Sequence, residues 1–478
     1  MTRIFSNSSG RKHSAASVIA IAAAVLLGLA AGISCAPDRT VSRYREAADG
    51  LRRAGLADEK AHDMLRRITD GGPRLTGSAG AAAAVDMTRK MMEELGFDNV
   101  HLEPVTVECW ERGEPEEARI FDSGQPAAEL PLSVSALGGS IGTPPGGITA
   151  PVVEVRSFDE LDGLGTAVAG KIVFFNRPMD RTLVEPFAAY GGAADQRVNG
   201  AARAGRLGAV AVLVRSLTFR IDDHPHTGLM EYAPDVPKIP AAAVSTSGAE
   251  KLSELLKSGR PISVRLKMSC RDMGPVPSAN VVGDIRGTER PDEIILVGGH
   301  LDSWDLAVGA HDDGAGCAAS LEALRLIKAL GLRPKRTIRA VMFMDEEFGG
   351  TGGRFYVQDA ARRGERHLVA MESDRGGFLP VGLAGGGSDP AFQRRLKAWS
   401  ALVRPLGVMA VGPGGGGVDI GPLVKQGAVP VSVVPNAQPY FDVHHSALDV
   451  LASVHPRELE MQAIILATLA YVLAQEGL

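Results

Sequence analysis

The chain has 478 residues, of which 45% are hydrophobic, 5% aromatic and 22% charged, and its net charge at pH 7 is −5. This length allows two or three domains with sizeable cores, and frequent glycine with few aromatic residues suits an α/β enzyme better than a fibrous or disordered chain. No basic tract is present, so the composition argues against a nucleic-acid partner.

The first 35 residues predict a signal peptide that is not part of the fold. Arg3, Arg11 and Lys12 are basic, and residues 18–33 form an apolar stretch too short for a comfortable membrane span. Residues 32–35 (Gly-Ile-Ser-Cys) resemble a bacterial lipobox, so the alternatives are a lipid anchor at Cys35 or ordinary signal-peptidase cleavage nearby. We therefore expect an exported protein that is periplasmic, secreted or anchored to a membrane as a lipoprotein.

The other three cysteines, Cys109, Cys270 and Cys317, are scattered along the chain. An odd and widely spaced set of this kind predicts neither a disulfide framework nor a zinc knuckle. The exported chain is therefore expected to fold without disulfides.

Residues 36–125 are predicted to be the first segment of an α/β catalytic domain. A charged helical pattern over 41–70 is broken by glycine and proline within 71–78. A second helix over 81–95 ends at Gly96, and residues 100–107 alternate as a strand does.

Residues 126–270 are predicted to form an inserted domain with its own core. Short apolar strands are expected at 152–155, 170–175, 209–214 and 262–268, with helices at 198–205 and 248–256. Residues 271–478 then resume the first pattern as the second catalytic segment. Strands at 280–285, 294–297 and 337–344 and a helix at 316–330 predict an α/β fold with a mostly parallel, doubly wound sheet.

A first group of chemically active residues follows the apolar strand at 294–297. His300 stands just beyond it, and Asp312 lies ten residues after Asp302 in a turn-rich segment. Imidazole nitrogen and carboxylate oxygen are both good zinc ligands, and Asp302 could accept the second ring N–H of His300. The alternative is that His300 is an ordinary histidine satisfied at the end of a strand.

Acidic residues follow two further strands. Asp345, Glu346 and Glu347 come directly after the strand at 337–344, and Asp374 follows an apolar run at 368–371. A cation would offset the cost of burying such acids, although a solvated loop is the alternative. One glutamate could bind a metal while the other takes a proton from a metal-bound water molecule.

His444 and His445 offer a final imidazole, although adjacent histidines are often a surface pair. Neighbouring side chains on an extended chain point to opposite sides, so we expect one ring to be a ligand and the other to face elsewhere. One imidazole here, together with His300 and three acids, would make two three-ligand sites if one carboxylate is shared. That arrangement is typical of two-metal hydrolases.

Five motifs in this order resemble the zinc-dependent exopeptidases that include bacterial aminopeptidases and glutamate carboxypeptidase II. They are HLDSWD (300–305), GAHDDGAG (309–316), DEEFGG (345–350), MESD (371–374) and HHSALD (444–449). The likeness extends to GPRLTGS (72–78), GKIV (170–173), PHTG (225–228), VPKIP (236–240) and SANVVGDIRG (278–287). The middle segment resembles the protease-associated domain that is inserted in such enzymes.

The resemblance implies a cofactor of two zinc ions per chain and a role for each site residue. His300, Asp312 and Asp374 would bind one zinc; Asp312, Glu347 and His445 would bind the other; Glu346 would be the general base and Asp302 would orient His300. His445 is chosen because the family's histidine ligand has an acid four residues later, here Asp449. His311, Asp345 and Val450 depart from the usual residues, but none replaces a predicted ligand.

The implied function is hydrolysis of peptide bonds in dipeptides or short peptides, with those peptides as partners and a homodimer left open. Whether the enzyme is a dipeptidase or carboxypeptidase, or instead an aminopeptidase, also stays open. An inactive receptor-like relative is a weaker alternative, because all five ligands and Glu346 are present. The inserted domain and the complete ligand set argue against a cyclase or transferase.

Overall fold

A computed structural model of the protein describes residues 39–122 and 129–478. The predictions for the signal peptide and for Cys35 lie outside the described residues. The chain divides into a short N-terminal unit (Met1–Arg43) and a large unit (Tyr44–Leu478), which holds both sheets and the candidate site. Among the described helices, none has the length and apolar character needed to span a membrane.

The residues before and after the middle segment build one eight-stranded sheet. Its strands, in spatial order, are β1 (Asp98–Glu111), β10 (Arg271–Ile285), β12 (Arg336–Phe343), β11 (Arg290–His300), β13 (Arg366–Glu372), β16 (Val429–Pro435), β14 (Pro380–Gly385) and β15 (Ala410–Gly412). The four central strands β12, β11, β13 and β16 are mutually parallel, whereas the β1–β10, β10–β12 and β14–β16 pairs are antiparallel. The predicted parallel sheet is therefore found at the centre, with antiparallel pairs added toward both edges.

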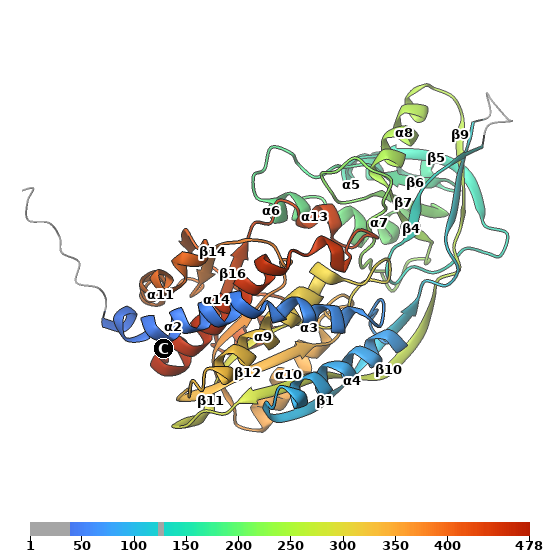
Figure 1. Ribbon diagram of the computed structural model, residues 1–478. Helices are drawn as coiled ribbons and strands as arrows, with labels where there is room; N and C mark the ends of the chain where they lie inside the picture. Colours follow the sequence, from blue (N-terminus) through green and yellow to red (C-terminus); the bar gives the residue numbers. More distant parts are fainter. Residues whose placement is uncertain (1–38, 123–128) are drawn as a thin grey trace, which may run out of the picture. The chain divides into compact units, whose positions relative to one another are not determined.

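Helices cover both faces of this sheet (Figure 1). They are α2 (Arg39–Asp58), α3 (Lys60–Thr69), α4 (Ala79–Glu94), α9 (Ala315–Ala329), α10 (Thr351–Arg362), α11 (Pro390–Val403), α12 (Gly421–Lys425), α13 (Tyr440–Val443) and α14 (Pro456–Glu476). Side chains alternate along β11, so Ile295 and Val297 join the core under α9 and α14, while Leu296 joins the core under α10 and α12. Burial on both faces explains the continuous apolar runs in the sequence.

The middle segment builds a second eight-stranded sheet. Its strands, in spatial order, are β3 (Glu129–Pro131), β2 (Glu117–Asp122), β9 (Ile262–Lys267), β5 (Ile148–Val155), β6 (Ile172–Phe175), β7 (Ala211–Arg215), β8 (Ala241–Val244) and β4 (Val134–Ala136). Its helices are α5 (Phe158–Leu164), α6 (Pro186–Gly191), α7 (Asp195–Arg206) and α8 (Thr246–Lys257). Two clusters of buried side chains, one on each face, give this sheet a core of its own.

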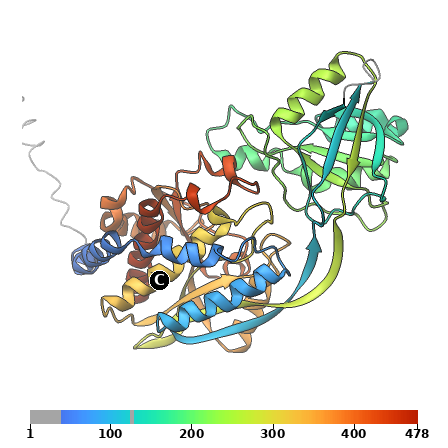
Figure 2. The same ribbon diagram turned by 45° about the vertical axis from the view of Figure 1, so that its right-hand side comes forward.

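The two long strands β1 and β10 carry the chain into and out of the middle segment. They pair antiparallel over almost their whole length, from Asp98 opposite Asp284 to Glu111 opposite Arg271 (Figure 2). Entry and exit therefore lie side by side. β2 already belongs to the second sheet although it precedes residue 126, and the predicted segment boundaries at 125/126 and 270/271 stay predictions.

The four parallel strands end at one edge of the central sheet, and the predicted site residues lie there. β11 ends at His300, β12 at Phe343 just before Asp345, and β13 at Glu372 just before Asp374. The chain after β16 leads to α13 and His445. Ligands commonly bind beyond the carboxyl ends of parallel strands, because connections leave an open edge there. The mixed α/β fold is confirmed.

A buried acidic pair lies where α9 and α14 pack against each other. Glu460 on α14 is fully buried and accepts a hydrogen bond from the Ala61 main-chain N–H at 3.0 Å. Glu322 on α9 is also fully buried and pairs with Arg325 at 2.6 Å. Burial, followed by repulsion from Glu322, raises the pKa of Glu460 to about 8.

The raised pKa makes the stability of the fold depend on pH. In the unfolded chain the pKa of a glutamate is about 4.3, so the stabilisation from this carboxyl is complete below that pH and is lost as pH rises toward 8. The free energy of unfolding should fall by up to about 1.4 kcal/mol per pH unit across that interval. Glu460→Gln should remove most of this slope in calorimetric melts from pH 5 to pH 8.5.

The half-buried Glu458 is on the same helix and provides a matched control. Glu458→Gln should keep the slope of the wild type. A Glu460→Gln protein with an unchanged slope would show that Glu460 ionises in the folded state as freely as in the unfolded chain.

Candidate metal centre

His300, Asp312 and Asp374 form a first group of neighbouring ligand atoms. The Nε2 atom of His300 lies 3.2 Å from Asp312 Oδ1 and 3.6 Å from Asp374 Oδ1. The three ligand atoms all lie within 4.8 Å of one another. Burial alone would lower the pKa of His300, but the contacts with Asp312 and Asp374 raise it well above its usual value. A cation held between these three ligand atoms would satisfy all of them.

Asp312 is held in place through its backbone. It lies in the irregular turn η2 (Ala310–Gly314) between β11 and α9. The Asp449 carboxylate accepts hydrogen bonds from the main-chain N–H groups of His311 and Asp312, at 2.7 and 3.0 Å. The acid that marked the C-terminal motif in the sequence thus fixes the carboxylate that the two ligand groups share.

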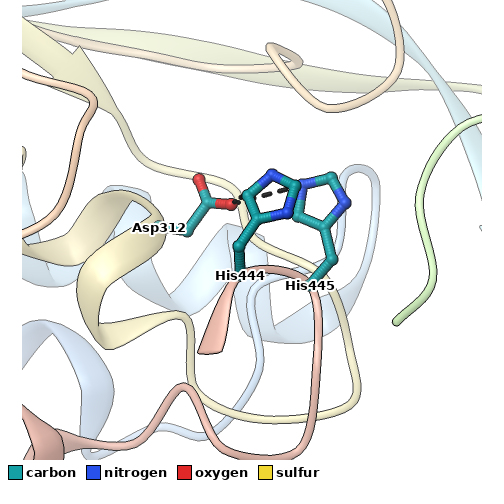
Figure 3. A group of neighbouring side chains, drawn as sticks. All are labelled: Asp312, His444 and His445. Atoms are coloured by element: carbon teal, nitrogen blue, oxygen red, sulfur yellow. Dashed lines mark ion pairs between the residues drawn. The ribbon is translucent and has the colours of Figure 1, made fainter. Parts of the chain in front are cut away.

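His444 and His445 both face Asp312, which corrects one expectation. Their Nε2 atoms lie 3.6 and 3.2 Å from Asp312 Oδ2, and their rings stack 3.5 Å apart (Figure 3). His444 was expected to face elsewhere, but the chain is not extended here. His445 has φ of +58°, in the left-handed region, so the two side chains leave the backbone on the same side. Asp312, His444 and His445 form a second group of neighbouring ligand atoms.

The middle segment orients the ring of His445. Nδ1 of His445 lies 3.2 Å from the carbonyl oxygen of Thr227, and the Thr227 N–H donates to the His445 carbonyl at 2.9 Å. This contact assigns the proton to Nδ1 and leaves Nε2 as the ligand atom. Thr227 belongs to the PHTG motif (225–228), which sequence reasoning recognised as a likeness but gave no role.

Glu347 completes the surroundings of His445. Its Oε2 lies 3.2 Å from His445 Nε2 and accepts a hydrogen bond from the indole N–H of Trp304 at 2.6 Å. Glu347 and Trp304 are both buried. Trp304 was within a recognised motif, but nothing in the sequence identified it as the partner that orients Glu347.

Asp302 holds the acidic loop more than it holds His300. Its carboxylate accepts the main-chain N–H groups of Asp345, Glu346 and Glu347 at 2.9 to 3.3 Å, and the Thr76 hydroxyl at 2.6 Å. Nδ1 of His300 lies 3.1 Å from the carbonyl oxygen of Asp302 and 3.7 Å from its carboxylate. The orienting contact predicted for the Asp302 side chain is therefore made by its main chain.

Glu346 lies at the wall of a cavity of about 300 Å³ that also borders Asp312, Asp374 and His445. Its carboxylate has no hydrogen-bond or ion-pair partner in residues 39–122 and 129–478. Burial, then the charges of Asp374 and Glu347, raise its pKa well above the usual value although His300 opposes them. A carboxylate free of protein partners beside the ligand groups can exchange a proton with a molecule in the cavity.

Several ligand atoms are buried without a hydrogen-bond partner among the described residues. They are His300 Nε2, Asp312 Oδ2, Glu347 Oε1 and Asp374 Oδ1. Leaving such atoms unsatisfied is costly, and a bound cation would satisfy all of them. Two imidazole nitrogens with three carboxylates suit zinc. The residues present therefore fit the expected metal, and Asp312 is common to both ligand groups.

Comparisons with known proteins point the same way. Residues 280–470 match the profile of peptidase family M28. Carboxypeptidase Q of Bos taurus is 39% identical over 421 residues, 88% of this chain and 86% of that protein. The solved structure of a peptidase M28 precursor from Shewanella amazonensis SB2B has a TM-score of 0.86 at 34% identity, covering 91% of this chain and 98% of that chain.

A zinc aminopeptidase from Bacillus subtilis shares the fold, with a TM-score of 0.63 at 18% identity, over 87% of this chain and 95% of that chain. The predicted resemblance to the zinc-dependent exopeptidases is confirmed. The sequence motifs predict a resemblance to carboxypeptidase Q in particular, and the comparisons confirm that as well.

Trp304 provides a test of the contacts around Glu347. Trp304→Phe removes the N–H donor but keeps an aromatic ring against Phe348, which lies 5.0 Å away between centroids. Losing an outer partner of a metal ligand typically weakens metal binding by roughly 10–100-fold. Competition with a chelator should show that loss of zinc affinity.

Trp110→Phe is the matched control, because Trp110 also contacts Phe348 but donates its N–H to the carbonyl of Ser140. That variant should keep the zinc affinity of the wild type. Equal affinities in the wild type and Trp304→Phe would remove Trp304 from the metal centre.

Proposed function

Because this chain belongs to peptidase family M28 and is therefore a peptidase, we propose that it is an exported enzyme with two zinc ions. Its proposed substrates are dipeptides or short peptides, as for a carboxypeptidase Q-like exopeptidase. Zinc dependence is typical of the family. The proposed ligands are His300, Asp312 and Asp374 for one ion; Asp312, Glu347 and His445 for the other.

One observation carries this proposal. Five side chains from separate segments meet at the carboxyl edge of the sheet, and four of them have a buried ligand-type atom without a hydrogen-bond partner among the described residues. Asp312 stands between the two imidazoles, 3.2 Å from His300 Nε2 and 3.2 Å from His445 Nε2. A carboxylate with one oxygen toward each imidazole is the arrangement expected of a shared ligand.

The chemistry follows from the groups that face the cavity. Zinc bound by these ligands would lower the pKa of a water molecule and polarise the carbonyl of the scissile peptide bond. Glu346 is placed to accept a proton from attacking water and to return it to the leaving amine. The main-chain N–H of Glu346 donates a hydrogen bond to the Asp302 carboxylate at 3.3 Å. This contact fixes the backbone of the proposed base relative to the strand that ends at His300.

Two further parts of the proposal rest on other features. Export rests on the N-terminal sequence, with Cys35 as the site of a lipid anchor or a position near ordinary cleavage. We assign the middle segment as a protease-associated domain because its second sheet has its own core and enters and leaves through paired strands. A homodimer stays an open alternative.

Glu346→Gln tests the proposed reaction. The variant keeps the size of the side chain but cannot accept a proton, so turnover of dipeptides should fall by about 10²–10⁴-fold with zinc content unchanged. The measurement is hydrolysis of free and end-blocked dipeptides by the purified mature protein. Near-wild-type turnover, or loss of zinc in this variant, would show that Glu346 and Glu347 are assigned in the wrong order.

His445 and His444 test the metal assignment. Elemental analysis of the wild type should approach two zinc ions per chain, and His445→Ala should lose one of them together with nearly all activity. His444→Ala should keep both, because Asp312, Glu347 and His445 already fill three positions and a tetrahedral ion leaves the fourth for water. If His444→Ala loses the ion instead, the stacked neighbour is the ligand.

The second candidate function is an aminopeptidase of the same family. The structural likeness to the Bacillus subtilis zinc aminopeptidase favours it only through a shared fold. The panel of dipeptides separates the two, because an aminopeptidase needs a free amino terminus and tolerates a blocked carboxyl terminus.

A further inference from the structure

One buried arginine in the described part of the chain stands apart from the others. Five arginines there are buried: Arg74, Arg197, Arg215, Arg336 and Arg339. Four of these guanidinium groups donate to main-chain oxygens or pair with acids, such as Arg339 with Asp284 at 2.7 Å. The guanidinium of Arg197 has no hydrogen-bond or ion-pair partner among the described residues and only lies over the ring of Tyr190, 5.4 Å from its centroid.

Arg197 is in the first turn of α7 and borders the same 300 Å³ cavity as Glu346 and Asp374. Its guanidinium lies against the backbone of Gly228, where an added Cβ would come within 2.4 Å of Nη1. Gly228 has φ of +141°, which favours glycine. The second sheet's segment thus supplies both the arginine and the space for its side chain beside the metal centre.

The rest of the cavity wall consists of an aromatic side and a side formed by acids and a histidine. Phe187, Tyr190, Tyr440 and Phe441 form an aromatic side, where α6 and α13 lie together (Figure 1). The acids and His445 form the side at which the peptide bond would be cleaved. A cavity of this volume is at the small end for ligand sites, so a substrate between Arg197 and Glu346 must be short.

We propose that Arg197 binds a carboxylate of the substrate, and that this carboxylate is the free C-terminus of a dipeptide. An isolated buried cation is costly, and a carboxylate accepts two parallel hydrogen bonds from the N–H groups of a guanidinium fork. The proposal rests on the proposed peptidase function and narrows it to substrates cleaved one residue from their carboxyl terminus.

The test compares three substrates: alanyl-leucine, alanyl-leucine amide and alanyl-glutamic acid α-amide, in which only the side chain carries a carboxylate. The wild type should prefer the free acid over its amide by roughly tenfold to a hundredfold in kcat/KM, the usual value of a charged hydrogen-bonded pair. In Arg197→Gln that ratio should fall close to one. Arg197→Lys should keep part of it, because it retains charge without the fork.

Arg203→Gln is the matched control. Arg203 is on the same helix but is only half-buried and pairs with Asp162 at 3.3 Å. It should keep the wild-type ratio. Melting temperature and zinc content of each variant show whether it folds, and Arg197→Met replaces Arg197→Gln if the latter does not.

The three substrates also distinguish a C-terminal carboxylate from the carboxylate of an acidic side chain as the group that Arg197 binds. An Arg197-dependent preference for alanyl-glutamic acid α-amide over alanyl-leucine amide would assign the arginine to an acidic side chain and overturn the C-terminal assignment. A free-acid preference that persists in Arg197→Gln, or no preference in the wild type, would overturn carboxylate binding by Arg197.

Binding distinguishes a failure of this inference from a failure of the peptidase function. Calorimetric titration of alanyl-leucine and its amide into the Glu346→Gln protein reports affinity without turnover. The amide should bind more weakly than the free acid to the Glu346→Gln protein. If this difference in affinity disappears when Arg197→Gln is introduced into the same protein, the inference is supported even if no peptide is hydrolysed. Equal binding of both peptides overturns it, whatever the activity.

Discussion

The structure depends on concentrating negative charge at one buried point. Asp312, Glu347 and Asp374 approach two imidazoles at the carboxyl edge of a parallel sheet, and two of these acids are almost fully buried. Carboxylates this close repel one another in a medium of low dielectric constant, so the arrangement needs compensating positive charge. The hydrogen bonds that Asp449, Trp304 and Thr227 make with Asp312, Glu347 and His445 hold these three residues in position before any cation binds.

That preorganisation is divided between main chain and side chain. The carboxylates of Asp302 and Asp449 do not serve as proposed metal ligands. Each instead accepts hydrogen bonds from main-chain N–H groups of the loop that carries a ligand. A glycine at the end of β11 also helps to position the turn that carries Asp312. A Cβ on Gly299 would lie 2.3 Å from Asp313 Oδ2, so only glycine lets the end of β11 approach the turn that carries Asp312.

Much of the fold and the site could be predicted because the relevant signals are local. Apolar strands ending in His300, Asp345 and Asp374 placed those residues at one edge, since parallel strands end together. The orientation of His444 could not be predicted, because it depends on a left-handed residue that only the surrounding packing stabilises. The contact of Thr227 with His445 and the position of Arg197 also lay beyond the sequence, because they join segments that show no pattern in common.

The contact between Thr227 and His445 has a consequence for how the molecule comes together. The two residues are 218 positions apart, with most of the central sheet formed by the chain between them. Contacts of such separation carry the loop-closure cost of the intervening chain and tend to form late. We expect the sheets to be assembled before the ring of His445 is oriented. Hydrogen-exchange pulse labelling during refolding would show protection at the Thr227 amide trailing that of β11, and simultaneous protection would argue against this order. The candidate metal centre would then be completed last, after both sheets have formed.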